Sequence, residues 1–170
     1  NSMENYLKRA LFQDFGKKVL PNKVLILLGA RRVGKTELLK NYLHTIPDGN
    51  YLQLNGEDIN DANLLKERSV ANYKRLLYNI DVLVIDEAQT IPEIGLILKL
   101  IVDSIDGIKV IATGSSIFDL NNNLGEPLVG RKNTLYLFPL AQMEYSQYEN
   151  YKQTTEKLEE RLLFGSYPEL

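Results

Sequence analysis

The sequence predicts an α/β fold in which a mostly parallel, five-stranded sheet is covered by helices on both faces. Short apolar runs of strand length alternate along the chain with segments of helical periodicity, as in proteins built from βαβ units. Several of these runs are almost continuous in Val, Ile and Leu, which is typical of strands that have helices on both sides. The chain has 170 residues, which suits a single domain with a substantial core.

Five apolar runs are predicted to be strands, at residues 24–28, 51–54, 82–85, 109–113 and 134–138. The first, third and fourth runs are nearly continuous in branched apolar residues, so we expect helices to cover both of their faces. The fifth run alternates more between apolar and polar residues and is predicted to lie at a sheet edge.

Helical periodicity fills the segments between these strands. The clearest helix is predicted for residues 35–46, where the apolar side chains form one stripe and Pro47 follows. A second helix is predicted for residues 93–105; because it is apolar nearly all round, we expect it to pack between the sheet and its neighbours. Weaker helical patterns cover residues 3–15, 63–77 and 156–164.

Composition limits the classes of function. The formal net charge is −2, so the chain as a whole has no electrostatic attraction to nucleic acid or anionic lipid. The chain has no cysteine and one histidine, which excludes disulfides, thiolate metal sites and multi-histidine clusters. The absence of cysteine fits a reducing cytoplasm, the location we expect. No apolar stretch reaches the roughly 20 residues of a membrane-spanning helix, so no membrane role is predicted.

Both ends of the chain suggest a fragment. Asn1 and Ser2 precede Met3 and resemble the remnant of an expression tag, so the domain is expected to cover residues 3–170. Residues 168–170 follow an amphipathic segment directly, without a polar tail. We therefore expect a longer protein whose C-terminal domain is missing from this sequence.

Residues 29–36 read GARRVGKT and match the phosphate-binding pattern G-x-x-x-x-G-K-[ST]. Gly29 and Gly34 allow a tight turn that points several backbone N–H groups at an anion. Lys35 is expected to contact the β- and γ-phosphates, and Thr36 to give a hydroxyl ligand to Mg²⁺. The motif follows a predicted buried strand and begins a predicted helix, whose dipole adds positive potential. We interpret it as a P-loop.

The cofactor-binding segment is predicted to comprise Gly29, Ala30, Arg31, Arg32, Val33, Gly34, Lys35, Thr36 and Glu37. Two interpretations of the arginine side chains stay open. Arg31 and Arg32 either help to neutralise a polyphosphate or face water, as exposed loop arginines usually do, and the second interpretation is favoured.

Asp86 and Glu87 follow an apolar strand in the segment VLVIDEAQ at residues 82–89. Ligands bind at the carboxyl ends of the strands in open α/β sheets, so both carboxylates are expected at the site. Asp86 is predicted to serve Mg²⁺, and Glu87 to polarise the water that attacks the γ-phosphate. The second carboxylate favours hydrolysis by the domain itself. Gln89 either orients water or contacts the sensor region, or it caps the following turn.

Two further segments supply candidate catalytic residues. KVIATGSS at residues 109–116 is a strand that ends in small hydroxyl residues. Thr113 or Ser115 is predicted to hydrogen-bond the attacking water or the γ-phosphate, and the sequence does not decide between them. Arg131, in LVGRK, is either a surface arginine or a finger that stabilises transition-state charge on a neighbouring chain's γ-phosphate. In the second case, activity would require assembly.

The segments GARRVGKT, VLVIDEAQ, KVIATGSS and LVGRKNTLYLFPL together resemble the AAA-type P-loop ATPase domain of prokaryotic proteins that carry a C-terminal domain of unknown function. The resemblance runs from about Lys23 to the GSYPEL ending. It implies an AAA+-like fold and the cofactors ATP and Mg²⁺. It also implies a nucleotide site at the P-loop, hydrolysis at Asp86 and Glu87, and a sensor at Thr113 or Ser115.

The expected function is Mg²⁺-dependent ATP binding and hydrolysis, coupled to a conformational change of an attached domain or partner. The alternative is a slow, nucleotide-dependent regulatory switch in which hydrolysis is incidental. A small-molecule phosphotransferase is disfavoured, because the sequence offers no arginine-rich lid. Besides ATP, the expected partners are the missing C-terminal domain and, as a candidate assembly, further copies of the chain; nucleic acid is not supported by the charge.

Overall fold

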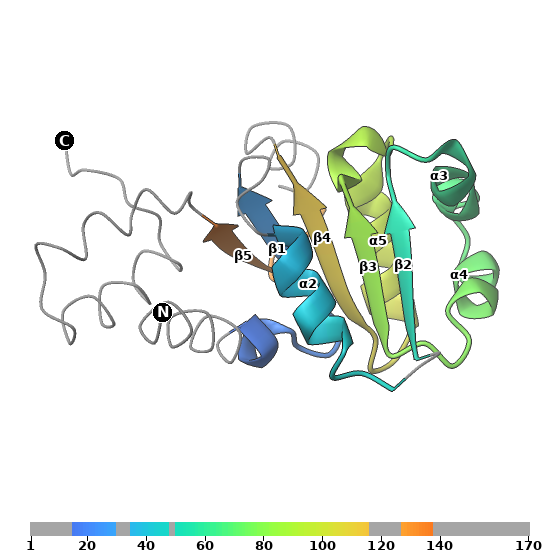
Figure 1. The fold of residues 1–170 in the computed structure, drawn as a ribbon. Helices are drawn as coiled ribbons and strands as arrows, with labels where there is room; N and C mark the ends of the chain where they lie inside the picture. The colour runs from blue at the N-terminus through green and yellow to red at the C-terminus, as the bar shows by residue number, and fades with distance from the viewer. Residues whose placement is uncertain (1–14, 30–34, 48–49, 116–126, 138–170) are drawn as a thin grey trace, which may run out of the picture.

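The computed structural model describes residues 15–29, 35–47, 50–115 and 127–137, and these form one five-stranded sheet with helices on both faces (Figure 1). The strands are β1 (Lys23–Gly29), β2 (Tyr51–Asn55), β3 (Val82–Asp86), β4 (Lys109–Gly114) and β5 (Lys132–Leu137). They are arranged in the order β2-β3-β4-β1-β5, and every neighbouring pair is parallel. The predicted strands are therefore confirmed, and the fifth does lie at a sheet edge.

Helices follow β1, β2 and β3 and cover the sheet. They are α2 (Lys35–Leu43), α3 (Ile59–Lys66), α4 (Val70–Leu76), the short 3₁₀ turn η1 (Ala88–Thr90) and α5 (Ile94–Ser104). The helix α2 lies on one face of the sheet and α5 on the other (Figure 1). Among the described residues, no helix is long and apolar enough to cross a membrane.

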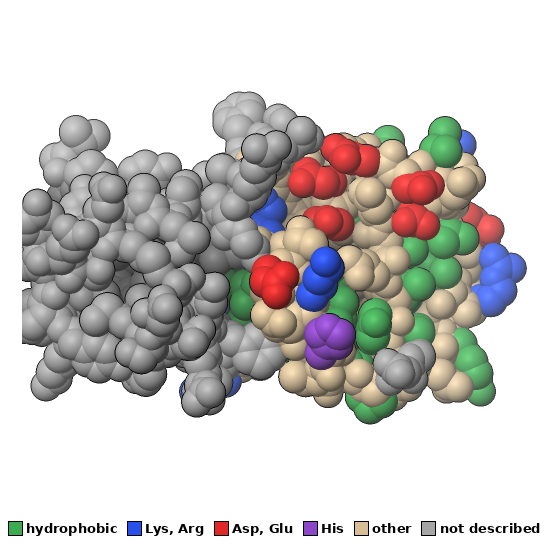
Figure 2. Space-filling view, viewed as in Figure 1, with side chains coloured by type: hydrophobic (Ala, Val, Ile, Leu, Met, Phe, Trp, Pro, Cys, Tyr) green, Lys and Arg blue, Asp and Glu red, His purple; other side chains and the backbone are tan. Residues whose placement is uncertain are grey.

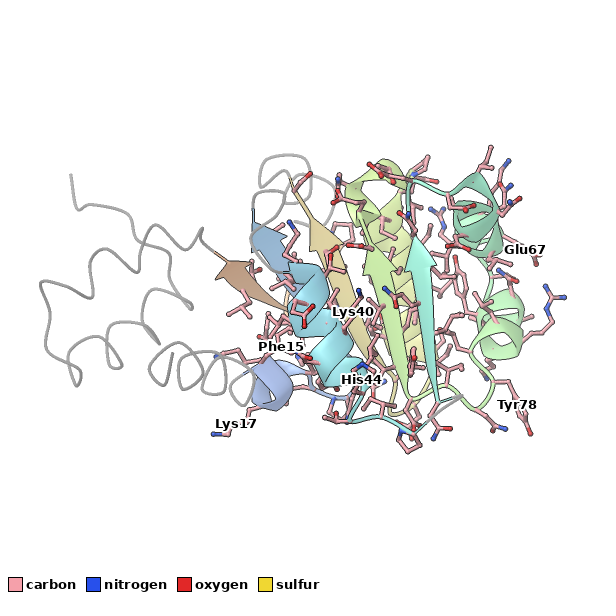
Figure 3. The ribbon with its side chains drawn as sticks, in the orientation of Figure 1. Phe15, Lys17, Lys40, His44, Glu67 and Tyr78 are labelled. Carbon is pink, nitrogen blue, oxygen red and sulfur yellow. The ribbon has the colours of Figure 1, made fainter. Side chains whose placement is uncertain are left out.

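The central strand β1 shows why its sequence is apolar throughout. Val24, Ile26 and Leu28 belong to the core on the α5 side. Leu25 and Leu27 belong to the core on the α2 side, which also includes Phe15, labelled in Figure 3. Each of these strand side chains is at most 2% exposed, and burial of one such side chain contributes about 1.5–3 kcal/mol. The helix on each face therefore has its own core against β1.

The single helix predicted at residues 63–77 is wrong, because the chain forms α3 and α4 with a break between them. Ser69 caps α4 by accepting a hydrogen bond from the Asn72 backbone N–H at 3.1 Å. The Asn72 side-chain amide donates to the carbonyl oxygens of Leu64 at 3.0 Å and Glu67 at 2.9 Å. These bonds satisfy carbonyls at the end of α3, which makes the break stable.

The remaining helix predictions have mixed outcomes. The helix predicted at residues 35–46 begins at Lys35 as expected but ends at Leu43, and residues 44–46 form a turn. His44 follows the end of α2 and is exposed (Figure 3). The helix predicted at residues 93–105 is confirmed as α5. Residues 3–14 and 156–164 lie outside the described residues.

Parallel strands place chemically different segments at the two ends of the sheet. The carboxyl ends of β3, β4 and β1 are adjacent in that order, so the segment after β4 lies between the acidic pair and the start of the P-loop. The opposite end carries the first residues of the strands, where Lys23 pairs with Lys109 and Val24 pairs with Lys132. We call these the carboxyl edge and the amino edge.

Candidate functional site

The described part of the P-loop motif lies at the carboxyl edge. Gly29 ends β1, and Lys35 begins α2 with only 7% of its surface exposed. The Lys35 ammonium donates a hydrogen bond to the Gly29 carbonyl oxygen at 2.5 Å. Thr36 and Glu37 follow in the first turn of α2 and are exposed. Lys35 therefore spans the base of the loop, whose residues 30–34 lie outside the described chain.

One threonine hydroxyl connects both members of the acidic pair. Asp86 ends β3, and Thr113 lies on the adjacent strand β4 with none of its surface exposed. The Thr113 hydroxyl donates to Asp86 Oδ1 and accepts a hydrogen bond from the Glu87 backbone N–H at 3.2 Å. Both hydrogen-bonding functions of this hydroxyl are thus engaged by the pair, so Thr113 fixes the turn in which Asp86 and Glu87 lie.

Glu87 adopts a left-handed backbone conformation, with φ 49° and ψ 46°. This conformation costs a non-glycine residue on the order of 1 kcal/mol, so the surrounding contacts must hold it. Thr90 supplies two of them, because its backbone N–H and its hydroxyl donate to the Glu87 carbonyl oxygen at 3.2 and 2.8 Å. The turn directs the chain away from β3, and the Glu87 carbonyl oxygen stays hydrogen-bonded to Thr90.

The Glu87 carboxylate receives two side-chain hydrogen bonds on the same oxygen. Gln89 donates from Nε2 to Glu87 Oε2 at 2.6 Å. Ser115, which follows β4 and is half-buried, donates from its hydroxyl to the same oxygen at 3.3 Å. The structure therefore brings Glu87, Thr113 and Ser115 together, in contact with Asp86.

Negative charge accumulates at the carboxyl edge. Glu57, Asp58 and Asp61 follow β2, next to the acidic pair at the end of β3. Figure 2 shows carboxylates gathered over the upper part of the described surface, where the strand arrows of Figure 1 point. A polyphosphate would meet unfavourable charge here, so its binding requires compensating cations.

The donors present at this edge fit Mg²⁺ bound together with a nucleotide. Mg²⁺ prefers oxygen ligands and usually takes one or two carboxylates, substrate phosphates and waters. Asp86 is half-buried at a strand end, and Thr36 adds an exposed hydroxyl at the start of α2. Within the described residues, no group of three or more His, Cys, Asp or Glu side chains could hold a metal ion alone. Such a sparse set suits a metal that phosphates help to bind.

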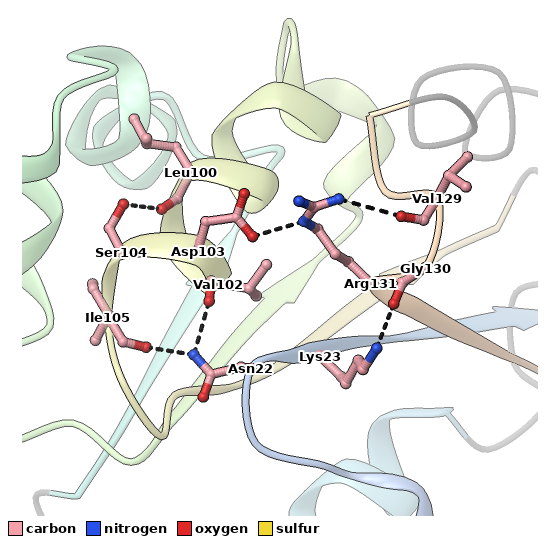
Figure 4. A network of polar contacts seen from close by, with 10 residues as sticks. All are labelled: Asn22, Lys23, Leu100, Val102, Asp103, Ser104, Ile105, Val129, Gly130 and Arg131. Carbon is pink, nitrogen blue, oxygen red and sulfur yellow. Dashed lines mark hydrogen bonds and ion pairs between the residues drawn. The ribbon is translucent and has the colours of Figure 1, made fainter.

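Arg131 lies at the amino edge, away from the acidic pair of its own chain. It directly precedes β5, which runs parallel to β1 in register from Val24, whereas the P-loop follows the far end of β1. The seven residues of β1 separate the two ends by about 20 Å. The Arg131 guanidinium Nε donates to Asp103 Oδ1 at 2.7 Å, and this bond raises the pKa of Arg131 (Figure 4).

Comparison with known proteins agrees with this arrangement. A family model described as an AAA domain matches residues 21–146, which is well over half of the chain. The chain belongs to the AAA domain family. Membership implies nucleotide binding and ATPase activity, and the fold predicted from the resemblance is confirmed.

One relative of this AAA domain is distant in sequence. An uncharacterized protein of Methanocaldococcus jannaschii is 26% identical in an alignment that covers 95% of this chain and 39% of that protein. The chain thus spans about two fifths of the length of this relative.

Two solved structures share the fold at low sequence identity. A crystal structure of the FIGL-1 AAA domain in complex with ADP has a TM-score of 0.52 and 14% identity, over 87% of this chain and 62% of that one. The Pif1 helicase from Candida albicans has a TM-score of 0.51 and 16% identity, over 81% of this chain and 41% of that one.

Sequence reasoning missed Gly56, which supports the acidic turn of this AAA domain. Its backbone N–H donates to the Asp86 carbonyl oxygen at 2.7 Å. A Cβ at this position would lie 2.4 Å from the Glu87 carbonyl oxygen and 2.6 Å from the Thr90 hydroxyl. The available signal was a glycine two residues after a predicted strand, at a sheet end where ligands bind.

Proposed function

We propose that this AAA domain binds ATP with Mg²⁺ at the carboxyl edge and hydrolyses it, and that hydrolysis changes the conformation of an attached domain or partner. The observation that carries this proposal is the Thr113 hydroxyl, which links Asp86 and Glu87 beside the strand that leads into the P-loop. The ADP in the similar FIGL-1 structure supports an adenine nucleotide as the ligand.

Each residue of the site has a distinct role in this proposal. The backbone N–H groups of residues 29–34 and the Lys35 ammonium bind the phosphates. Thr36 and Asp86 hold Mg²⁺, which neutralises phosphate charge when bound. Glu87 accepts a proton from a water whose oxygen attacks the γ-phosphorus, while the bond to the β-γ bridging oxygen breaks and ADP leaves.

We assign the sensor role to Ser115 rather than Thr113. Thr113 is fully buried and uses its only hydroxyl proton on Asp86, so it has none to donate to a phosphate. Ser115 is half-buried, and its hydroxyl makes a longer bond of 3.3 Å to Glu87. A hydroxyl in this position can exchange its partner for a γ-phosphate oxygen or the attacking water.

Arg131 enters this proposal as a residue that acts on another copy of the chain. Arg131 lies at the amino edge, on the order of 20 Å along the strands from the P-loop of its own chain. The site that it could complete is therefore the one on a second copy of the chain. Hydrolysis would then depend on assembly, and an isolated chain would behave as the slow nucleotide-dependent switch.

The central test replaces Glu87 with Gln. This variant should bind Mg²⁺ and ATP like the parent, and turnover should fall on the order of 10²-fold or more, because the proton acceptor is lost. Glu93→Gln is a matched control: Glu93 has the same left-handed backbone conformation, but its exposed side chain pairs with Arg68 at 3.2 Å. Equal turnover in the parent and in Glu87→Gln would remove Glu87 from the mechanism.

A further inference from the structure

Gln89 makes a short, charge-assisted contact with the candidate catalytic carboxylate. It lies in η1, two residues after Glu87, and its side chain turns back so that Nε2 donates to Glu87 Oε2 at 2.6 Å. Hydrogen bonds to an ionised partner are shorter and stronger than those between neutral groups. This contact therefore restricts the orientation of the Glu87 side chain.

The arrangement leaves the two carboxylate oxygens in different environments. Oε2 accepts from both Gln89 and Ser115, which approach it from η1 and from the end of β4. Within the described part of the chain, Oε1 accepts no hydrogen bond. Fixing one oxygen in this way directs the other, and a proton acceptor needs a lone pair that is not already engaged.

The other end of the Gln89 amide also points to a role beyond folding. Gln89 Oε1 is buried, and among the described residues it has no hydrogen-bond partner. A buried acceptor without a partner is unfavourable, so the position is not optimised for stability. Rotating the amide by half a turn would bring its oxygen against the carboxylate, so the donor end must face Glu87.

The alternative role of Gln89, as a cap for the following turn, is not supported. In the described structure, neither η1 nor α5 has a side-chain hydrogen bond at its N-cap, and both N-cap residues are glutamates. Among the described residues, the one hydrogen bond of the Gln89 side chain is the bond to Glu87.

We infer that Gln89 is a positioning residue, which holds Oε2 of Glu87 so that Oε1 faces the attacking water. The inference rests on the proposed hydrolysis by Glu87. In this role the amide neither accepts the proton nor contacts the phosphate; it sets the direction from which the carboxylate receives the proton.

The test measures kcat and KM for ATP with saturating Mg²⁺ in the full chain. Gln89→Met keeps the length of the side chain but removes the donor. It should lower kcat about 10- to 100-fold, the scale of a hydrogen bond to a charged group, while KM changes less than about twofold, because the phosphate contacts are untouched. Gln53→Met, on an exposed residue of β2, is the matched control and should leave both constants unchanged.

A double-mutant cycle separates positioning from a general structural effect. In a Glu87→Gln background, Gln89→Met should cause no further loss of kcat, because the carboxylate that it positions is already gone. Gln89→Leu repeats the comparison if the methionine variant melts at a lower temperature than the parent.

An unchanged or increased kcat in Gln89→Met would overturn the inference, as would the same proportional loss in both backgrounds. Those results would leave the proposed function intact as long as Glu87→Gln kept its large loss of turnover. If Glu87→Gln itself kept full turnover, the proposed function would fail, and the inference about Gln89 with it.

Discussion

The two edges of the sheet use the same kinds of polar contact for different purposes. At the carboxyl edge, Thr113, Ser115 and Gln89 all hydrogen-bond to the acidic pair, and Glu87 keeps a left-handed backbone conformation. These contacts hold two carboxylates at the end of β3, one strand removed from the P-loop strand β1, although like charges in proximity are unfavourable. Such concentration of charge and strain is typical of sites selected for chemistry rather than for stability.

At the amino edge, side-chain hydrogen bonds instead connect the turn before β1 to the end of α5. Asn22 also has a left-handed backbone, with φ 55°, in the turn before β1. Its side-chain amide donates to the carbonyl oxygens of Val102 at 2.8 Å and Ile105 at 2.9 Å (Figure 4). Its Oδ1 accepts from the Gly107 N–H at 2.9 Å. Comparing Glu87 with Asn22 shows that a left-handed backbone does not by itself identify a functional residue. The side chain must also be available for chemistry.

Among the variants that test this comparison of the two edges, we expect the largest loss of turnover at Arg131. If this residue acts on a second copy, Arg131→Ala should lower turnover in concentrated protein on the order of 10³-fold, the scale of an arginine finger. Asp103→Ala is the matched control, because it breaks the same ion pair but keeps the guanidinium. The measurement is turnover per chain across protein concentration, which should rise in the parent and in Asp103→Ala.

A flat concentration series in the parent, or equal activity in Arg131→Ala, would contradict a role in trans. In that case the amino edge would have only a structural role, and Arg131 would be the surface arginine that the sequence also allowed.

The second prediction compares two glycines, one at each edge. Gly56→Ala would press a Cβ against the Glu87 carbonyl and the Thr90 hydroxyl, so the acidic turn must shift. We expect turnover to fall about 10- to 100-fold through misplacement of the carboxylate, with a loss of about 1–3 kcal/mol in unfolding free energy. The measurements are steady-state hydrolysis and denaturant unfolding.

Gly107→Ala is the counterpart at the amino edge. Its added Cβ meets no atom within 4 Å, but its φ of 77° disfavours a side chain. Stability should drop by about 1 kcal/mol, and turnover per folded chain should stay at the parent value. A larger loss of turnover in Gly107→Ala than in Gly56→Ala would reverse the assignment of roles to the two edges.

The sequence predicted the carboxyl edge better than the amino edge, for a physical reason. The P-loop and the acidic pair are short motifs whose residue types follow from phosphate and Mg²⁺ chemistry, and they directly follow strands. Parallel pairing then brings them to one edge, so their approximate positions required no knowledge of side-chain contacts. The contacts of Thr113 and Ser115 could not be distinguished, because two hydroxyls two residues apart differ only in burial and partner.

Tertiary contacts account for what was missed. Gly56 matters because β2 pairs with β3, a neighbour relation that the sequence does not state. The break between α3 and α4 depends on the Asn72 amide, which reaches back to carbonyls of the preceding helix. Helical periodicity continues through that break, so the pattern alone predicted one helix.

The last and smallest effect on turnover is expected at Asn22. Asn22→Ala removes three side-chain hydrogen bonds and leaves alanine in a left-handed conformation. We expect a loss of about 2–4 kcal/mol in unfolding free energy, with turnover per folded chain unchanged. Asn79→Ala is the matched control, since Asn79 has φ 59° and is exposed; it should cost only about 1 kcal/mol, from the backbone alone. The check is turnover of Asn22→Ala at temperatures where the variant is still folded. If turnover fell there, the two edges would be coupled through α5 or β4, and the amino edge would no longer count as structural.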